Sequence, residues 1–208
     1  MRTPKDFVKY LTEIFDIKQD SFYDGVSFIE FFEGREIDFS IHVGCTKGVL
    51  IPEREDFVIK TPLSITEEGL ELSNFIDREK QIYNKAKEFK LNQIFVPNIK
   101  ILEICGHPFY SQERVNIKNI DEKRLTDEML SFVTALDEIQ IQYCPDTFRD
   151  TALFWVDDFI KYYSLEVFIR LCKFCGANDV IDIHQNNVGY NKRGAPVIFD
   201  YGGIENSF

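Results

Sequence analysis

Three polar residues near the end of the chain have types and spacing that suit metal and proton chemistry. Asp182 and Asn187 lie in the stretch DIHQNN, and Asp200 follows the apolar run PVIF, just before a glycine pair. If the segments VGY and PVIFD pair across the turn NKRG, all three residues collect near one end of a hairpin. Asn and Asp oxygens presented from adjacent segments suit a hard divalent cation such as Mg²⁺. Asp182 could then receive a proton from an attacking hydroxyl group, or orient that group.

Each of these residues also has an ordinary structural explanation. Asp and Asn are common turn formers, so Asp182 could cap a turn and Asp200 could simply end a strand before Gly202. Taken one at a time, the residues favour that explanation. Their joint spacing favours a site.

The upstream chain predicts the elements that would position such a site. The segments DFVKYLTEIF and DGVSFIEFFEG have helical periodicity. The pattern then alternates, which predicts three antiparallel strands, namely EIDFSIHVG, GVLIP and DFVIKTP. A helix is expected from the capping-box pattern SITE at Ser64 to about Lys90. Two more strands, NIKILEIC and HPFYSQERV, follow this helix.

The remainder of the chain is predicted to be mostly helical. LTDEMLSFVTALDEI indicates one helix, and DTALFWVDDFIKYYSLEVFIRLCKFC reads as a long helical run before the closing hairpin. The fold class is therefore α+β. We expect a helical extension over residues 1–36, a sheet-containing lobe over 37–116 and a helical lobe over 117–208.

Composition limits the classes of partner. The 208 residues include 24 Lys and Arg against 35 Asp and Glu, a formal net charge of -11. This field repels phosphate groups, so neither nucleic acid nor an anionic membrane is expected as a general partner. The first residues lack the apolar core of a signal peptide and no stretch reaches membrane-span length, which predicts a cytoplasmic protein.

The five cysteines are an odd number without framework spacing, which favours reduced thiols. Cys172 and Cys175 form a CxxC pair, but no second pair or nearby paired histidines complete a zinc site. Because the pair falls in a helical run, buried thiols are favoured over a metal or redox role.

The closing stretch resembles the catalytic and metal-binding segments of the protein-kinase-like superfamily. Those segments read Asp, four residues, Asn, and then a hairpin that ends in Asp-Phe-Gly or a variant, which here is Asp200, Tyr201 and Gly202. The DxHxxN form is closer to the aminoglycoside-phosphotransferase and choline-kinase branch than to typical protein kinases. The resemblance implies Asp182 as the catalytic base or as the group that orients the hydroxyl, Asn187 and Asp200 as magnesium ligands, and ATP as cosubstrate. It also implies a kinase-like bilobal fold, with a five-stranded antiparallel sheet and one helix in the first lobe and a reduced, mostly helical second lobe.

The resemblance extends upstream in the expected order. Lys60 ends the third strand, where kinases carry the lysine that contacts the α- and β-phosphates. Glu79, on the following helix, fits the glutamate that pairs with that lysine, and Asp77 is a less favoured substitute. A solvated strand-end lysine and a surface helix glutamate are the ordinary alternatives for Lys60 and Glu79.

The turn GCTKG takes the place of the glycine-rich loop of kinases. Small residues in a tight turn allow backbone N–H groups to approach phosphates, so Gly44, Thr46 and Lys47 are expected near the nucleotide. The pattern is not GxGxxG, because only Gly44 and Gly48 are present. An ordinary hairpin turn is the alternative.

The segment SQERV matches the hinge that receives adenine in kinases. The resemblance implies backbone contacts from Glu113 and Val115, with Gln112 guarding the back of the pocket. The chain departs from the family at Val180, where a His or Tyr usually precedes the catalytic Asp, and IENSF supplies no activation segment. This pattern resembles minimal kinases of the phage type.

The expected function is ATP- and Mg²⁺-dependent phosphoryl transfer to a hydroxyl group of a protein or a small molecule. Two alternatives belong to other classes. One is a catalytically inactive kinase-like module that binds nucleotide or inhibits a host protein. The other is nucleotidyl transfer, in which AMP is attached to the target.

Overall fold

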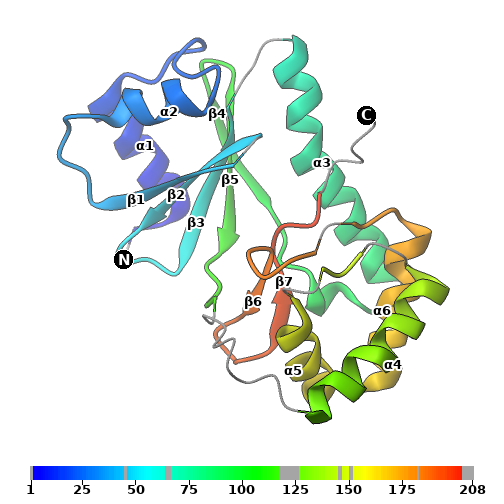
Figure 1. The fold of residues 1–208 in the computed structure, drawn as a ribbon. Helices are drawn as coiled ribbons and strands as arrows, with labels where there is room; N and C mark the ends of the chain where they lie inside the picture. The colour runs from blue at the N-terminus through cyan, green and yellow to red at the C-terminus, as the bar shows by residue number, and fades with distance from the viewer. Residues whose placement is uncertain are drawn as a thin grey trace. The chain divides into compact units, whose positions relative to one another are not determined.

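The computed structural model describes residues 2–44, 46–63, 67–117, 127–144, 147–149, 152–181 and 183–202. Contacts divide the chain into two compact units. The first unit comprises Met1–Lys80 with Pro97–Arg114, and the second comprises Gln81–Val96 with Val115–Phe208 (Figure 1). Residues 64–66 of the predicted capping box SITE and the predicted catalytic Asp182 lie outside the described residues.

The first unit is built on a five-stranded antiparallel sheet in the order β1-β2-β3-β5-β4. The predicted three-strand meander and the two later strands are confirmed. Their bounds are β1 Phe39–Val43, β2 Lys47–Pro52, β3 Phe57–Pro62, β4 Ile99–Ile104 and β5 His107–Glu113. The long helix α3, Glu67–Glu88, follows β3 as the sequence predicts.

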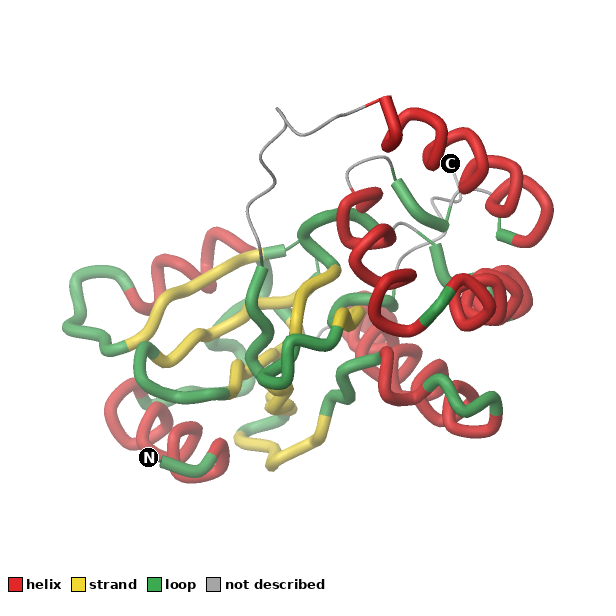
Figure 2. The backbone as a smooth tube through the Cα atoms, turned by 90° about the horizontal axis from the view of Figure 1, so that it is seen from below, coloured by secondary structure: helices red, strands yellow, loops and turns green. Residues whose placement is uncertain are grey.

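Two N-terminal helices pack against this sheet (Figures 1 and 2). Helix α1, Pro4–Phe15, begins with a capping box in which the Thr3 hydroxyl accepts from the Asp6 N–H. Helix α2, Gly25–Phe32, is capped in the same way by Asp24. The helices and the sheet share a core rich in phenylalanine, where Phe7 meets Phe39 edge to face at 5.7 Å between ring centroids. Residues 1–36 therefore belong to the same compact unit as the sheet.

The second unit is mostly helical and carries the predicted hairpin. Its elements are the short 3₁₀ helix η1 Asn92–Ile94, helices α4 Asp127–Tyr143, α5 Leu153–Tyr163 and α6 Leu165–Ala177, and strands β6 Val188–Tyr190 and β7 Pro196–Ile198. The α+β class with its five-stranded sheet, single following helix and helical remainder is confirmed.

The helical run that the sequence predicts before the hairpin is confirmed, but it is not continuous. The run divides into α5 and α6 at Ser164, whose φ of 103° breaks the helix. The Ser164 hydroxyl accepts a hydrogen bond from the Val167 N–H and so caps α6. Because the apolar periodicity continues through Ser164, the sequence pattern alone does not reveal the break between the two helices.

The cysteines of the second unit lie in its core. Cys172 and Cys175 on α6 are buried, as is Cys144 just after α4, and all three are free thiols. Among the described residues, no group of three or more His, Cys, Asp and Glu side chains is arranged to hold a metal ion.

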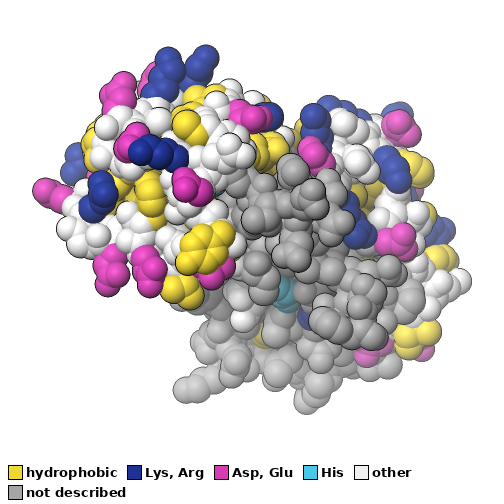
Figure 3. Space-filling view, turned by 90° about the horizontal axis from the view of Figure 1, so that it is seen from above, with side chains coloured by type: hydrophobic (Ala, Val, Ile, Leu, Met, Phe, Trp, Pro, Cys, Tyr) yellow, Lys and Arg dark blue, Asp and Glu magenta, His cyan; other side chains and the backbone are white. Residues whose placement is uncertain are grey.

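No helix within the described ranges is long and apolar enough to cross a membrane. Acidic and basic side chains are interspersed over the described surface in the view of Figure 3.

His107 generates a prediction about pH. Its imidazole is fully buried beside Phe22, with 4.7 Å between ring centroids, and burial lowers its pKa below the ordinary value of about 6.5. The backbone of Lys18 and Gln19 and the charge of Asp20 offset this only in part. Below about pH 6.5, His107 becomes protonated in the unfolded chain while it stays neutral in the folded chain. The contribution of this group to the free energy of unfolding is therefore fully present above about pH 6.5. It falls at lower pH by at most about 1.4 kcal/mol per pH unit.

A His107→Leu variant should therefore lose stability less steeply than the wild type between about pH 6.5 and 5. Urea unfolding at several pH values measures this. His42→Gln, on the exposed side of β1, is the matched control and should keep the wild-type slope. Equal slopes for the wild type and His107→Leu would contradict the assignment.

Candidate functional site

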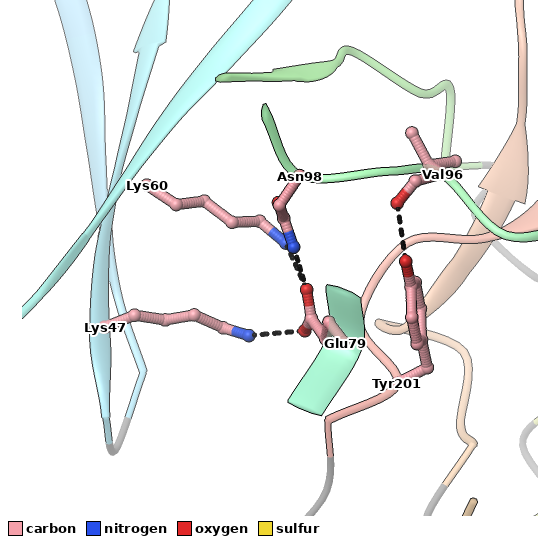
Figure 4. Close-up of polar contacts among 6 residues, drawn as sticks. All are labelled: Lys47, Lys60, Glu79, Val96, Asn98 and Tyr201. Atoms are coloured by element: carbon pink, nitrogen blue, oxygen red, sulfur yellow. Dashed lines mark hydrogen bonds and ion pairs between the residues drawn. The ribbon is translucent and has the colours of Figure 1, made fainter. Parts of the chain in front are cut away.

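A fully buried carboxylate on α3 is the centre of the polar cluster in the first unit. Glu79 pairs with two lysines from neighbouring strands (Figure 4). The Lys47 Nζ lies 3.1 Å from Oε1, and the Lys60 Nζ lies 3.9 Å from Oε2. The side chains are 10% exposed for Lys47, 3% for Lys60 and 0% for Glu79, so water screens these charges little.

The strand register explains why both lysines reach the same carboxylate. Val49 of β2 is the register partner of Lys60 on β3, so these residues share one face of the sheet. Because alternate residues of a strand face the same side, Lys47 lies on that face too. The neighbouring residue Leu50 lies on the opposite face, in the phenylalanine-rich core.

Asn98 is a third partner of Glu79. It lies just before β4, and its side-chain amide Nδ2 donates to Oε2 of Glu79 (Figure 4). Oε2 therefore faces both the amide of Asn98 and the ammonium of Lys60, whereas Oε1 accepts from Lys47. The Oδ1 atom of Asn98 is buried without a hydrogen-bond partner within the described part of the chain.

Lys47 of the predicted phosphate loop has contacts that differ from those expected from the sequence. Gly44 and Thr46 flank the turn between β1 and β2, and the Gly44 N–H donates to the Lys47 carbonyl at 2.9 Å within that turn. Lys47 itself begins β2, and its ammonium is directed to Glu79. The Gly44 N–H thus forms a hydrogen bond within the turn, and Lys47 forms an ion pair in the buried cluster.

Packing accounts for the second glycine of this turn. A Cβ atom on Gly48 would lie 2.4 Å from Cζ of Phe28, far inside van der Waals contact. Phe28 is fully buried and touches Phe22 and Phe32 edge to face, so its ring has little room to move. Gly48 is required because Phe28 of α2 packs directly against the sheet at this position.

The predicted hinge lies at the end of β5. Gln112 is buried opposite Val58 of β3, and Glu113 is the exposed last residue of the strand. The Arg114 N–H donates to the Asp56 carbonyl at 2.9 Å, and the next residue, Val115, is half-buried. The backbone path of this segment is therefore fixed on both sides of Glu113.

In the second unit, the predicted hairpin forms and brings Asn187 and Asp200 to the same end. Strands β6 and β7 pair with Val188 opposite Ile198. The Phe199 N–H then donates to the Asn187 carbonyl at 3.0 Å, which continues the pairing to the residue beside Asp200. Both side chains are half-buried.

Side chains and backbone of the second unit fix this hairpin. Trp155 of α5 donates from its indole Nε1 to the Gly189 carbonyl at 3.2 Å. The Tyr190 hydroxyl donates to the carboxylate of Asp158, and burial together with this bond raises the pKa of Tyr190 well above its ordinary value. Asn116 exchanges two backbone hydrogen bonds with Tyr190, both of 2.9 Å.

Tyr201, the residue after Asp200, is held in place by contacts within the second unit. Tyr201 is buried, and its hydroxyl donates to the Val96 carbonyl at 3.1 Å (Figure 4). Its ring meets Phe95 edge to face at 4.9 Å between centroids. The Val96 N–H also donates to the Ile198 carbonyl at 2.9 Å, so the chain is fixed immediately before and after Asp200.

Thr147 forms hydrogen bonds to both Val180 and Ile183. Its hydroxyl donates to the Val180 carbonyl at 2.9 Å, and its own carbonyl accepts from the Ile183 N–H at 2.7 Å. Val180 and Ile183 are both fully buried. The predicted role of Asp182 itself stays a prediction.

The structure therefore brings together Lys47, Lys60 and Glu79 in one unit, and Asn187 and Asp200 in the other. Sequence reasoning missed Asn98 and the pairing of Lys47 with Glu79. Nothing in PNIK marks Asn98, and the pairing of Lys47 follows only once the strand register is known.

Comparisons with known proteins give little beyond this geometry. No protein-family model matches the sequence, and no curated protein is significantly similar to it. One solved structure, that of the bifunctional kinase-methyltransferase WbdD, matches at 15% sequence identity with a TM-score of 0.34. The match covers 76% of this chain and 29% of the WbdD chain. So low a TM-score supports no conclusion about activity.

Gly48 generates a prediction that separates packing from phosphate binding. Gly48→Ala should destabilise the protein by about 1–3 kcal/mol, because the new methyl group collides with Phe28. Gly44→Ala is the matched control: its Cβ would lie at an ordinary 3.6 Å from the Lys47 carbonyl, so its stability should change by about 0.5 kcal/mol or less.

Urea midpoints at equal m-values measure both effects. The double variant Gly48→Ala/Phe28→Leu should recover part of the loss, since the smaller side chain makes room. A Gly48→Ala protein as stable as the wild type would refute the packing explanation.

Proposed function

We propose that this protein is an ATP- and Mg²⁺-dependent phosphotransferase that acts on a hydroxyl group of a protein or a small molecule. The buried ion pair of Lys60 and Glu79 supports this function most directly, because it joins the third strand of the sheet to the helix that follows. Buried lysines are uncommon, and burial of this one requires a charged partner.

The chemistry of phosphoryl transfer explains the need for such a pair. The transition state is loose and its charge is spread over phosphate oxygens, so catalysis consists mainly of positioning and charge stabilisation. A lysine whose ammonium is held by a fixed carboxylate provides a preorganised positive charge for the α- and β-phosphates. Lys60 is proposed for that role, with Glu79 as its partner.

Asn187 and Asp200 are proposed as the residues that would hold magnesium. One amide and one carboxylate at the same end of a hairpin form an oxygen-donor pair of the type that Mg²⁺ prefers, with water and phosphate oxygens completing its shell. The metal supplies charge neutralisation at the transferred phosphate when it is bound. The donor chemistry of these two residues fits that ion.

Asp182 is proposed as the group that orients the acceptor hydroxyl and takes up its proton. Gly44 and Thr46 are proposed beside the phosphates, and the backbone of Glu113 and Val115 beside adenine. The two alternatives to this function are a catalytically inactive binding protein and a nucleotidyl transferase.

Asp200→Ala tests the nucleotide and metal assignments together. With ATP at about a hundred times its Kd, Mg²⁺ and ATP should stabilise the wild type by about 2.7 kcal/mol, which raises Tm by about 5–10 °C. Asp200→Ala should lose most of this shift and keep the Tm of the ligand-free wild type, because it removes a metal ligand. Thermal scans with ATP, with and without Mg²⁺, measure the effect.

Asp137→Ala, at an exposed position on α4, is the control and should keep the full shift. If Asp200→Ala is stabilised as much as the wild type, the metal assignment is wrong. If Mg²⁺ and ATP leave the Tm of the wild type unchanged, the proposed function is wrong.

A further inference from the structure

Three described residues, Lys47, Lys60 and Asn98, contact the Glu79 carboxylate at different distances. Lys47 lies within hydrogen-bond distance of Oε1, at 3.1 Å, and Asn98 donates a hydrogen bond to Oε2. Lys60 lies 3.9 Å from Oε2, which is an ion-pair distance beyond hydrogen-bond length. Each carboxylate oxygen therefore has a hydrogen-bond donor other than Lys60.

This difference matters because a buried carboxylate loses much stability when a hydrogen-bonded partner leaves it. A lysine that alone held Glu79 would have to break that bond before it could approach a ligand. Here the hydrogen bonds from Lys47 and Asn98 hold the carboxylate without a contribution from Lys60.

The arrangement also gives Lys47 a place that the turn sequence did not suggest. Lys47 begins β2 two positions from Val49, on the sheet face that carries Lys60, and its Nζ is directed to Glu79 (Figure 4). Asn98 approaches the same carboxylate from the segment before β4. Residues from two separate parts of the chain thus converge on one side chain of α3.

We propose that Lys47 and Asn98 are positioning residues, one for each oxygen of Glu79, and that they hold this carboxylate in place while Lys60 contacts the phosphates of the nucleotide. This division of roles rests on the proposed function, since it assigns Lys60 to ATP. Lys47 then acts on the reaction only through Glu79.

A kinetic double-mutant cycle with MgATP as the probe tests the indirect action. ADP release is measured for Lys47→Met, Asn98→Leu and Lys60→Met, each in the wild-type and in the Glu79→Gln background. In the wild-type background, Lys47→Met and Asn98→Leu should each lower turnover by about tenfold to a hundredfold through misplaced charge. In the Glu79→Gln background, these two changes should have almost no further effect.

Lys60→Met is the matched comparison. Because Lys60 contacts the nucleotide directly, its loss should lower turnover and raise the KM for ATP in both backgrounds. An equal loss from Lys47→Met in both backgrounds would overturn the proposal, since Lys47 would then act on the nucleotide itself. A loss of stability alone cannot produce the expected pattern, because it would lower turnover in either background.

A second cycle on urea unfolding needs no nucleotide and so separates this proposal from the proposed function. The coupling of Glu79→Gln with Lys47→Met should be larger than its coupling with Lys60→Met. A larger coupling with Lys60 would overturn the proposal. If wild-type protein neither binds nor turns over MgATP, the function is wrong while this cycle still decides which residue holds Glu79.

If Lys47→Met does not fold, Lys47→Gln takes its place in both cycles, because an amide can still donate to the carboxylate. Its effects should then be smaller in size but should vanish in the Glu79→Gln background in the same way. Persistence of its effect in that background would overturn the proposal.

Discussion

The burial of the Glu79 carboxylate is the constraint on which the polar cluster of the first unit depends. A charge taken out of water costs several kcal/mol unless partners compensate it, and removal of one partner from a buried pair costs about 3–5 kcal/mol. Lys47, Lys60 and Asn98 supply that compensation from β2, β3 and the segment before β4. The strand register and the placement of α3 must therefore be correct together, since a slip of one residue would turn both lysines to the opposite face.

The second unit meets a different constraint, because its candidate metal ligands are held by backbone geometry. The hairpin of β6 and β7 is short, and so small a hairpin is not stable by itself. Trp155, Asp158 and Asn116 fix β6, and Val96 fixes β7 and Tyr201. These contacts place Asn187 and Asp200 on rigid chain, which is what a binding site requires. Aromatic residues next to the two candidate ligands therefore help to fix the backbone that carries them.

Local patterns were sufficient to predict much of this fold. Alternation in EIDFSIHVG and DFVIKTP identified the strands, and the turn NKRG between two apolar runs identified the closing hairpin. Pairings between distant segments were harder to predict. The contact of Asn98 with Glu79 spans 19 residues and has no periodic signal, and the pairing of Lys47 with Glu79 depends on a strand register that no local pattern supplies. Ser164 was missed because a serine inside an apolar helical run reads equally well as a helix residue or as a cap.

Transfer of label from ATP distinguishes phosphoryl transfer by this protein from nucleotidyl transfer and from catalytic inactivity. Wild-type protein and Asp182→Asn are incubated with Mg²⁺, a cell extract as the source of acceptors, and ATP labelled at either the γ- or the α-phosphate. The wild type should transfer the γ-label and not the α-label. In Asp182→Asn this transfer should fall by about a hundredfold or more while affinity for MgATP is kept, because only the group that orients the hydroxyl is lost. Transfer of the α-label, or γ-label transfer that is equal in the two proteins, would contradict it.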